Sequence, residues 1–335
     1  MQLNVITPAA LTVTAALLLA AAGPDDSVQL RFAPTAGTVT THAIEIGRSV
    51  EAGDLAVSMN GEEVNPQYLP ELFIEYTTAT TAEITDHFLP AEDDIAGLWR
   101  RRTTEGLQGS FDMGLSMGEQ DMEMSAEATS ELDGAPFLIG RNADDEVVAR
   151  WADSDNELST ELLDSVRPEF QPTGLLPKDP VGTDDTWEAD ASALSDLLGL
   201  SDSLPWTWSG ADAGSIPATG ETTYEGDLTL RLVDIRTEDD VVLCTIALSG
   251  DLIETETKPG DLSQAPVEGT ATDTTTTTYV LKGEFVWNVS AHHLASLELT
   301  GEGEGEQLTV KDAGQPGPEY SSTIQHTATL SVLVR

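Results

Sequence analysis

The pattern Gly114-Leu115-Ser116-Met117-Gly118 has the Gly-x-Ser-x-Gly spacing of a hydrolase nucleophile. That motif works at a strained strand-to-helix turn, which lifts the serine toward a histidine. Here Ser116 stands within an apolar–polar alternation typical of a β-strand, and no crossover helix pattern follows it. The sequence therefore favours a chance match over a catalytic serine.

None of the five histidines has the spacing of a metal site, such as His-x-His or His-x-x-x-His. His326 shares the parity of nearby apolar residues, so we expect it to point inward, as a hydrogen-bonded core residue rather than a catalytic base. The acidic run 153–157 lacks the later glycine and glutamate of an EF-hand loop, and we interpret it as a helix-capping turn. We predict no metal and no cofactor.

Arg100, Arg101 and Arg102 form the one basic cluster of the sequence. Alternation along a strand would place Arg101 on the opposite face from the other two. We therefore expect these arginines to pair with nearby carboxylates rather than to form a single anion pocket.

Met113, Met117, Met122 and Met124 fall on one parity of two neighbouring strand patterns. The flexible thioether side chain adapts to apolar ligands of varied shape, although methionines equally fill a core. We take these four residues and His326 as candidate ligand-binding residues. No catalytic residue is identified, so a protein without enzymatic activity is the favoured hypothesis.

Acidic residues outnumber basic ones, with 59 Asp and Glu against 15 Lys and Arg and a formal charge of −44. Such a field repels nucleic acids and anionic lipid surfaces, which argues against both as partners. It also destabilises the compact state by self-repulsion, which salt screens over a Debye length of about 8 Å. The charge therefore predicts a saline, halophilic setting, with a cation-binding surface as the alternative.

Residues 1–22 are expected to be a cleavable signal peptide. The apolar run 9–22 is shorter than the roughly 20 residues of a membrane-spanning helix, and Ala20 and Ala22 suit a signal peptidase. We therefore expect a periplasmic or extracellular protein without a membrane span. Cys244 is the only cysteine and stands in an apolar run, so we expect a buried thiol.

Alternation with period two dominates the rest of the chain, and short turns join consecutive strand patterns, such as 109–117 with 122–128. Several patterns exceed the usual strand length of about 5–6 residues. These features predict a mainly β fold with a large curved antiparallel sheet, half-barrel or barrel-like. Two short helices are expected in the middle of the chain, over 155–166 and 191–200.

A Gly-, Ala- and Ser-rich stretch at 209–220 predicts a soft boundary. It separates an N-terminal β-meander with the short helices, 23–210, from a C-terminal β-meander, 211–335. The second unit is either separate or a continuation of the same sheet.

Residues 176–187 (LPKDPVGTDDTW) and 282–288 (KGEFVWN) resemble stretches of a group of uncharacterised exported bacterial β-rich proteins. The resemblance implies an exported β protein and supplies neither an activity nor catalytic residues. In physical terms, Pro177 and Pro180 favour an extended crossing, Gly182 permits a tight turn, and Trp187 can cover an edge of the core.

Three functions are open on these grounds. The first is an exported protein that binds an apolar small molecule, or a segment of another envelope protein, in its curved sheet. The second is a carboxylate-dependent hydrolase of an extracellular polymer. The third is a structural component of the cell envelope.

Overall fold

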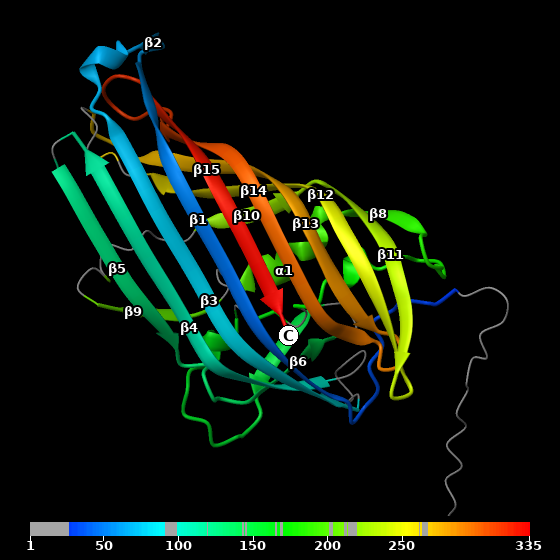
Figure 1. Ribbon diagram of the computed structural model, residues 1–335. Coiled ribbons are helices and arrows are strands. Elements are labelled where there is room, and N and C mark those ends of the chain that lie inside the picture. Colours follow the sequence, from blue (N-terminus) through cyan, green and yellow to red (C-terminus); the bar gives the residue numbers. More distant parts are fainter. Residues whose placement is uncertain are drawn as a thin grey trace, which may run out of the picture.

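The computed structural model describes residues 27–90, 99–118, 120–142, 144, 146–164, 166–167, 170–200, 204–210, 213, 220–260, 262 and 267–335. Within these residues the chain forms one antiparallel sheet of 15 strands (Figure 1), which confirms the mainly β prediction. The expected signal peptide, 1–22, lies outside the described residues.

The strands follow the apolar–polar alternation of the sequence, because successive side chains of a strand point to opposite faces. Their bounds are β1 Val39–Met59, β2 Glu62–Glu63, β3 Leu72–Leu89, β4 Trp99–Met117, β5 Gln120–Ser130, β6 Phe137–Arg141, β7 Val147–Trp151, β8 Thr186–Asp190, β9 Trp206–Ser209, β10 Glu221–Glu225, β11 Asp227–Glu238, β12 Val241–Gly260, β13 Ala271–Asn288, β14 His293–Lys311 and β15 Tyr320–Val334. β1 has 21 residues and β12 has 20, so the expected long strands are confirmed.

The order of strands along the sheet is β7-β6-β4-β3-β1-β15-β14-β13-β12-β11-β8. β5 also pairs with β4 and carries β9 on its other side, while β10 pairs with β12 and β2 with β1. β1 and β15 lie side by side in the middle (Figure 1), so strands from 23–210 and from 211–335 share one sheet. The sheet curves but is not closed, so a closed barrel, one of the alternatives, is wrong.

The described residues contain one short α-helix, α1 Ser195–Leu198, which continues a 3-10 turn at Ala191–Leu194. The other expected helix, over 155–166, is wrong, because only a 3-10 turn forms there, at Thr160–Leu163. Short helices are marginal without tertiary support. Here Leu163 and Val166 are both buried in the core, and the 3-10 turn ends at Leu163.

The acidic run 153–157 forms a turn, as expected, but it does not cap a helix directly. The side-chain oxygen of Asn156 accepts a hydrogen bond from the backbone N–H of Leu158 at 2.8 Å. The cap of the following 3-10 turn is instead Ser159, whose hydroxyl oxygen accepts from the N–H of Glu161. Further 3-10 turns lie at Pro66–Tyr68 and Thr173–Leu175.

The core occupies the inner face of the sheet, and the chain's own connecting segments fill it. Leu175, Leu194, Leu197 and Leu198 come from the segment between β7 and β9, and each is 1% exposed or less. They belong to the same buried cluster as the inward side chains of β11 to β15. Burial of this segment therefore fixes it against the sheet, where Figure 1 shows α1 behind the strands.

Arg100 and Arg102 are buried while Arg101 is exposed, which confirms the expected alternation. Nε and Nη2 of Arg102 donate to the two carboxylate oxygens of Asp86, each at 2.7 Å. Nη1 of Arg102 donates to the backbone carbonyl of Arg167, also at 2.7 Å. The arginine thus joins β3 and β4 to the segment that fills the inner face.

The outer face of the sheet places glutamates directly opposite one another on neighbouring strands. The pairs are Glu51 with Glu75, Glu83 with Glu105, and Glu284 with Glu298, all exposed. Like charges in opposed positions destabilise a sheet. The structure thus locates part of the self-repulsion that the net charge implies.

We expect the melting temperature to rise by about 5–10 °C between low salt and molar NaCl, because salt screens these glutamate pairs. Differential scanning calorimetry across a NaCl series measures the shift. A variant with Glu75→Gln, Glu105→Gln and Glu298→Gln removes one partner of each pair and serves as the control. It should melt higher in low salt and respond less to NaCl; a melting temperature independent of salt in the unmodified protein would contradict the expectation.

Candidate functional site

Four methionines gather on the inner face near the hairpin that joins β4 to β5. Met113 lies opposite Met124 and Leu115 opposite Met122, on the same face as the buried Phe111. Together with inward side chains at the start of β3 they form an apolar surface, here called the methionine patch: Leu72, Ile74, Met113, Leu115, Met117, Met122 and Met124. Within the described residues, none of these side chains belongs to the buried core clusters.

His326 points inward from β15, as expected, but it does not lie beside the methionines. Along the ladder, Ala52 of β1 and Ile74 of β3 stand between His326 and Leu115. The buried imidazole shares a hydrogen bond of 2.8 Å with the hydroxyl of Thr277, and burial lowers the pKa of the histidine. His326 is therefore a hydrogen-bonded core residue in this structure, and Ala52 lies between it and Ile74 of the methionine patch.

A row of glycines on β14 makes room for the rings beside it. Gly301, Gly303 and Gly305 occupy successive inward positions, where Tyr279 and His326 lie across the strand. A Cβ atom on Gly303 would stand 2.8 Å from the Tyr279 ring, and one on Gly305 would stand 2.7 Å from Nε2 of His326. The alternation Gly-Glu-Gly-Glu-Gly at 301–305 was the sequence signal for this arrangement.

A polar network lies at the centre of the inner face, next to the C-terminal end of α1. Arg48 forms an ion pair with Glu254 at 3.1 Å and donates to the hydroxyl of Tyr224 at 3.1 Å. It also donates to the backbone carbonyl of Leu198 at 3.3 Å, and Tyr224 donates to Glu254 at 3.4 Å. No motif in the sequence identifies these residues, because each stands alone in its own strand pattern.

Two tyrosines flank this network on the inner face. Burial raises the pKa of Tyr76 to about 12, with the negative charges of Glu256 and Glu254 adding to the effect. Burial, followed by the charge of Glu254, also raises the pKa of Tyr279. Both phenols are therefore protonated at neutral pH and can donate hydrogen bonds.

Ser116 lies within β4, and its hydroxyl donates to Asp121 at 2.7 Å. Cys244 is fully buried, and burial, with a contribution from Asp234, raises the pKa of its thiol to about 11. In the described ranges, no three His, Cys, Asp or Glu side chains are grouped as metal ligands would be.

None of the helices that the structure describes combines the length and the apolar character needed to cross a membrane.

Comparison with known proteins adds little. No protein-family model and no curated protein matches the chain. The secretin-domain β-barrel of InvG from the Salmonella SPI-1 injectisome shares 9% identity at a TM-score of 0.15, covering 88% of this chain and 61% of that one. OccK7 from Pseudomonas aeruginosa shares 7% identity at a TM-score of 0.11, covering 88% and 98%. This chain therefore spans about 61% of the secretin chain.

Proposed function

We propose that the protein is a non-catalytic binding protein that holds an apolar ligand on the methionine patch. The observation that carries the proposal is the contrast between the two parts of the inner face. Where the chain's own segments fill the face, apolar side chains are almost fully buried. On the methionine patch they are only half-buried, and Met122 is 47% exposed.

An apolar surface left open in this way gains about 25 cal/mol for each Å² that a ligand removes from water. Methionine side chains fit such a ligand well, since they adopt many shapes at little cost. Tyr76 lies opposite Met113 at the inner border of the patch, and its protonated hydroxyl can donate to a polar head group. The ligand we propose is therefore a molecule with an apolar body and a hydrogen-bond acceptor at one end.

The acidic charge and residues 1–22 support a periplasmic or extracellular place for this binding. The hydrolase and the structural envelope component have no comparable support among the described residues.

We expect the protein to bind the neutral fluorescent probe N-phenyl-1-naphthylamine saturably, because the probe is apolar and carries no charge for the protein to repel. In the double variant Leu115→Gln/Met124→Gln, affinity should fall at least about tenfold, since each change replaces an apolar contact by an amide. Fluorescence titration measures both. Native mass spectrometry before and after delipidation also shows whether a ligand co-purifies.

The matched control is Val280→Gln, which changes an exposed apolar residue, 55% accessible, in a different strand. It should leave the affinity unchanged. Circular dichroism confirms that all variants are folded. Absence of saturable binding by the unmodified protein, or equal binding by the double variant, would refute the proposal.

A further inference from the structure

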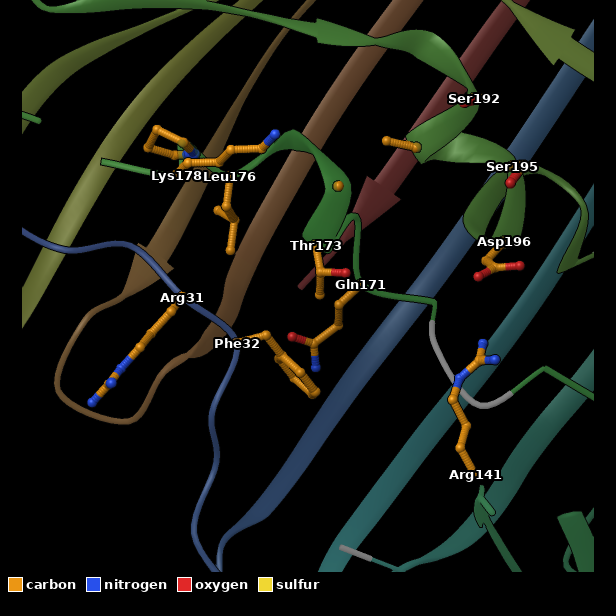
Figure 2. Close-up of a pocket in the computed structure, with 13 residues that line it drawn as sticks. Arg31, Phe32, Arg141, Gln171, Thr173, Leu176, Lys178, Ser192, Ser195 and Asp196 are labelled. Atoms are coloured by element: carbon orange, nitrogen blue, oxygen red, sulfur yellow. The ribbon is translucent and has the colours of Figure 1, made fainter. Parts of the chain in front are cut away.

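A separate pocket lies between the segment that precedes β1 and the Pro-rich crossing that precedes β8 (Figure 2). Its volume is about 590 Å³, within the range of about 300–1,000 Å³ typical of small-molecule sites. None of the residues that line it belongs to the methionine patch. It is therefore an independent candidate site.

The lining of this pocket reverses the charge balance of the protein. Acidic residues outnumber basic ones by 59 to 15 in the chain. In the pocket, the lining includes three basic residues, Arg31, Arg141 and Lys178, and one acidic residue, Asp196. A local excess of positive charge on so acidic a protein favours an anion at this one place.

The two ends of the pocket differ in their charged groups. In Figure 2, Arg141 and Asp196 point toward one another, while the side chains of Arg31 and Lys178 extend in different directions from two other segments. Within the described residues, neither Arg31 nor Lys178 forms an ion pair. Burial lowers the pKa of His292, and the positive charge of Arg31 lowers it further.

Backbone contacts hold the segments of Arg31 and Lys178 together. Val28 and Val181 exchange two backbone hydrogen bonds, of 2.8 and 3.0 Å, between the segment before β1 and the crossing. The amide of Gln29 donates to the carbonyl of Lys178 at 3.4 Å. The two cationic side chains are thus carried on a fixed frame rather than on independent loops.

Polar and apolar groups complete the lining. Gln171 is buried, and its side-chain oxygen accepts from the backbone N–H of Leu294 at 2.9 Å, which leaves its amide hydrogens as donors. Phe32 and Leu176 add apolar surface. Donors and cations beside apolar side chains suit an organic anion better than an inorganic ion.

We propose that this pocket binds a small organic anion, attracted by the positive charges of Arg31 and Lys178 in its lining, with an apolar part against Phe32 and Leu176. Arginine holds carboxylates and phosphates through paired hydrogen bonds, and lysine through its charge. This site is independent of the ligand proposed for the methionine patch.

Isothermal titration calorimetry in 0.15 M NaCl, where the Debye length is about 8 Å, tests the proposal with three probes: phenyl phosphate, benzoate and the neutral benzyl alcohol. We expect at least one of the two anions to bind saturably and benzyl alcohol not to bind. The anion that binds more tightly identifies the preferred group. No binding by either anion, or equal binding by the alcohol, would overturn the proposal.

The variants Arg31→Met and Lys178→Met are each expected to weaken binding of that anion about tenfold, and the double variant about a hundredfold. Both side chains are exposed, so their loss should not unfold the protein. Lys282→Met, which removes an exposed charge on β13, is the matched control and should change affinity less than about twofold. Equal affinity of the double variant and the control would refute the assignment.

Discussion

Replacing Asp86 by asparagine is expected to lower the free energy of unfolding by about 3–5 kcal/mol. The side chains of Asp86 and Arg102 are 2% and 4% exposed, and the carboxylate accepts two hydrogen bonds of 2.7 Å from the guanidinium. Asparagine keeps the volume but leaves a buried positive charge without its counter-ion. Urea denaturation followed by circular dichroism measures the loss.

Two further variants separate this effect from a general sensitivity to charge. Asp184→Asn removes an exposed partner of Arg231, at 3.8 Å and with side chains 80% and 53% exposed, and should cost less than about 0.5 kcal/mol. The double variant Asp86→Leu/Arg102→Met replaces both buried charges by apolar groups and should recover much of the stability. Similar losses of unfolding free energy for Asp86→Asn and Asp184→Asn would contradict the expectation that the buried ion pair contributes more than the exposed one.

Replacing Trp287 by alanine is expected to cost about 3–5 kcal/mol, because it leaves a large cavity in the core. Trp287 is 0% exposed and stands on β13 between Cys244 of β12 and Leu294 of β14. Its indole N–H has no hydrogen-bond partner among the described residues. Trp287→Phe should therefore cost less than about 2 kcal/mol, since phenylalanine fills much of the space and removes a buried donor. The same denaturation experiment measures both variants.

Trp187 provides the matched comparison, because its indole N–H donates to the carbonyl of Leu175 at 2.7 Å. Trp187→Phe loses that hydrogen bond and should cost about 1–2 kcal/mol beyond the change in packing. The prediction for Trp287 fails if its phenylalanine variant is as unstable as its alanine variant.

The strands could be predicted from the sequence because period-two alternation is a local signal. The hairpin signal for 109–117 and 122–128 is equally local, and β4 and β5 pair as expected. The pairing of β1 with β15 could not be predicted, since nothing within either strand identifies its partner. The helix expected over 155–166 failed for a related reason: burial against the sheet outweighed its helical spacing.

In the candidate sites, too, some contacts follow from local sequence patterns and others depend on the topology of the sheet. The methionines lie on one face as expected, because they occupy alternate positions in the two strands of a single hairpin. His326 points inward as expected, but β1 and β3 lie between β15 and β4, and this strand order depends on the topology of the sheet. Arg31 and Lys178 share a pocket through a contact between distant segments, and no spacing in the sequence signals it.

The central position of β1 and β15 bears on how the chain acquires its fold during biosynthesis. β1 is the first long strand to be made, and β15 follows every other described strand. Until β15 emerges, β1 and β14 each lack a neighbour, and the nascent chain holds two incomplete halves. Because the contact between β1 and β15 joins residues far apart in the sequence, we expect folding to be slow. The high negative charge of the chain would meanwhile keep neighbouring nascent chains apart.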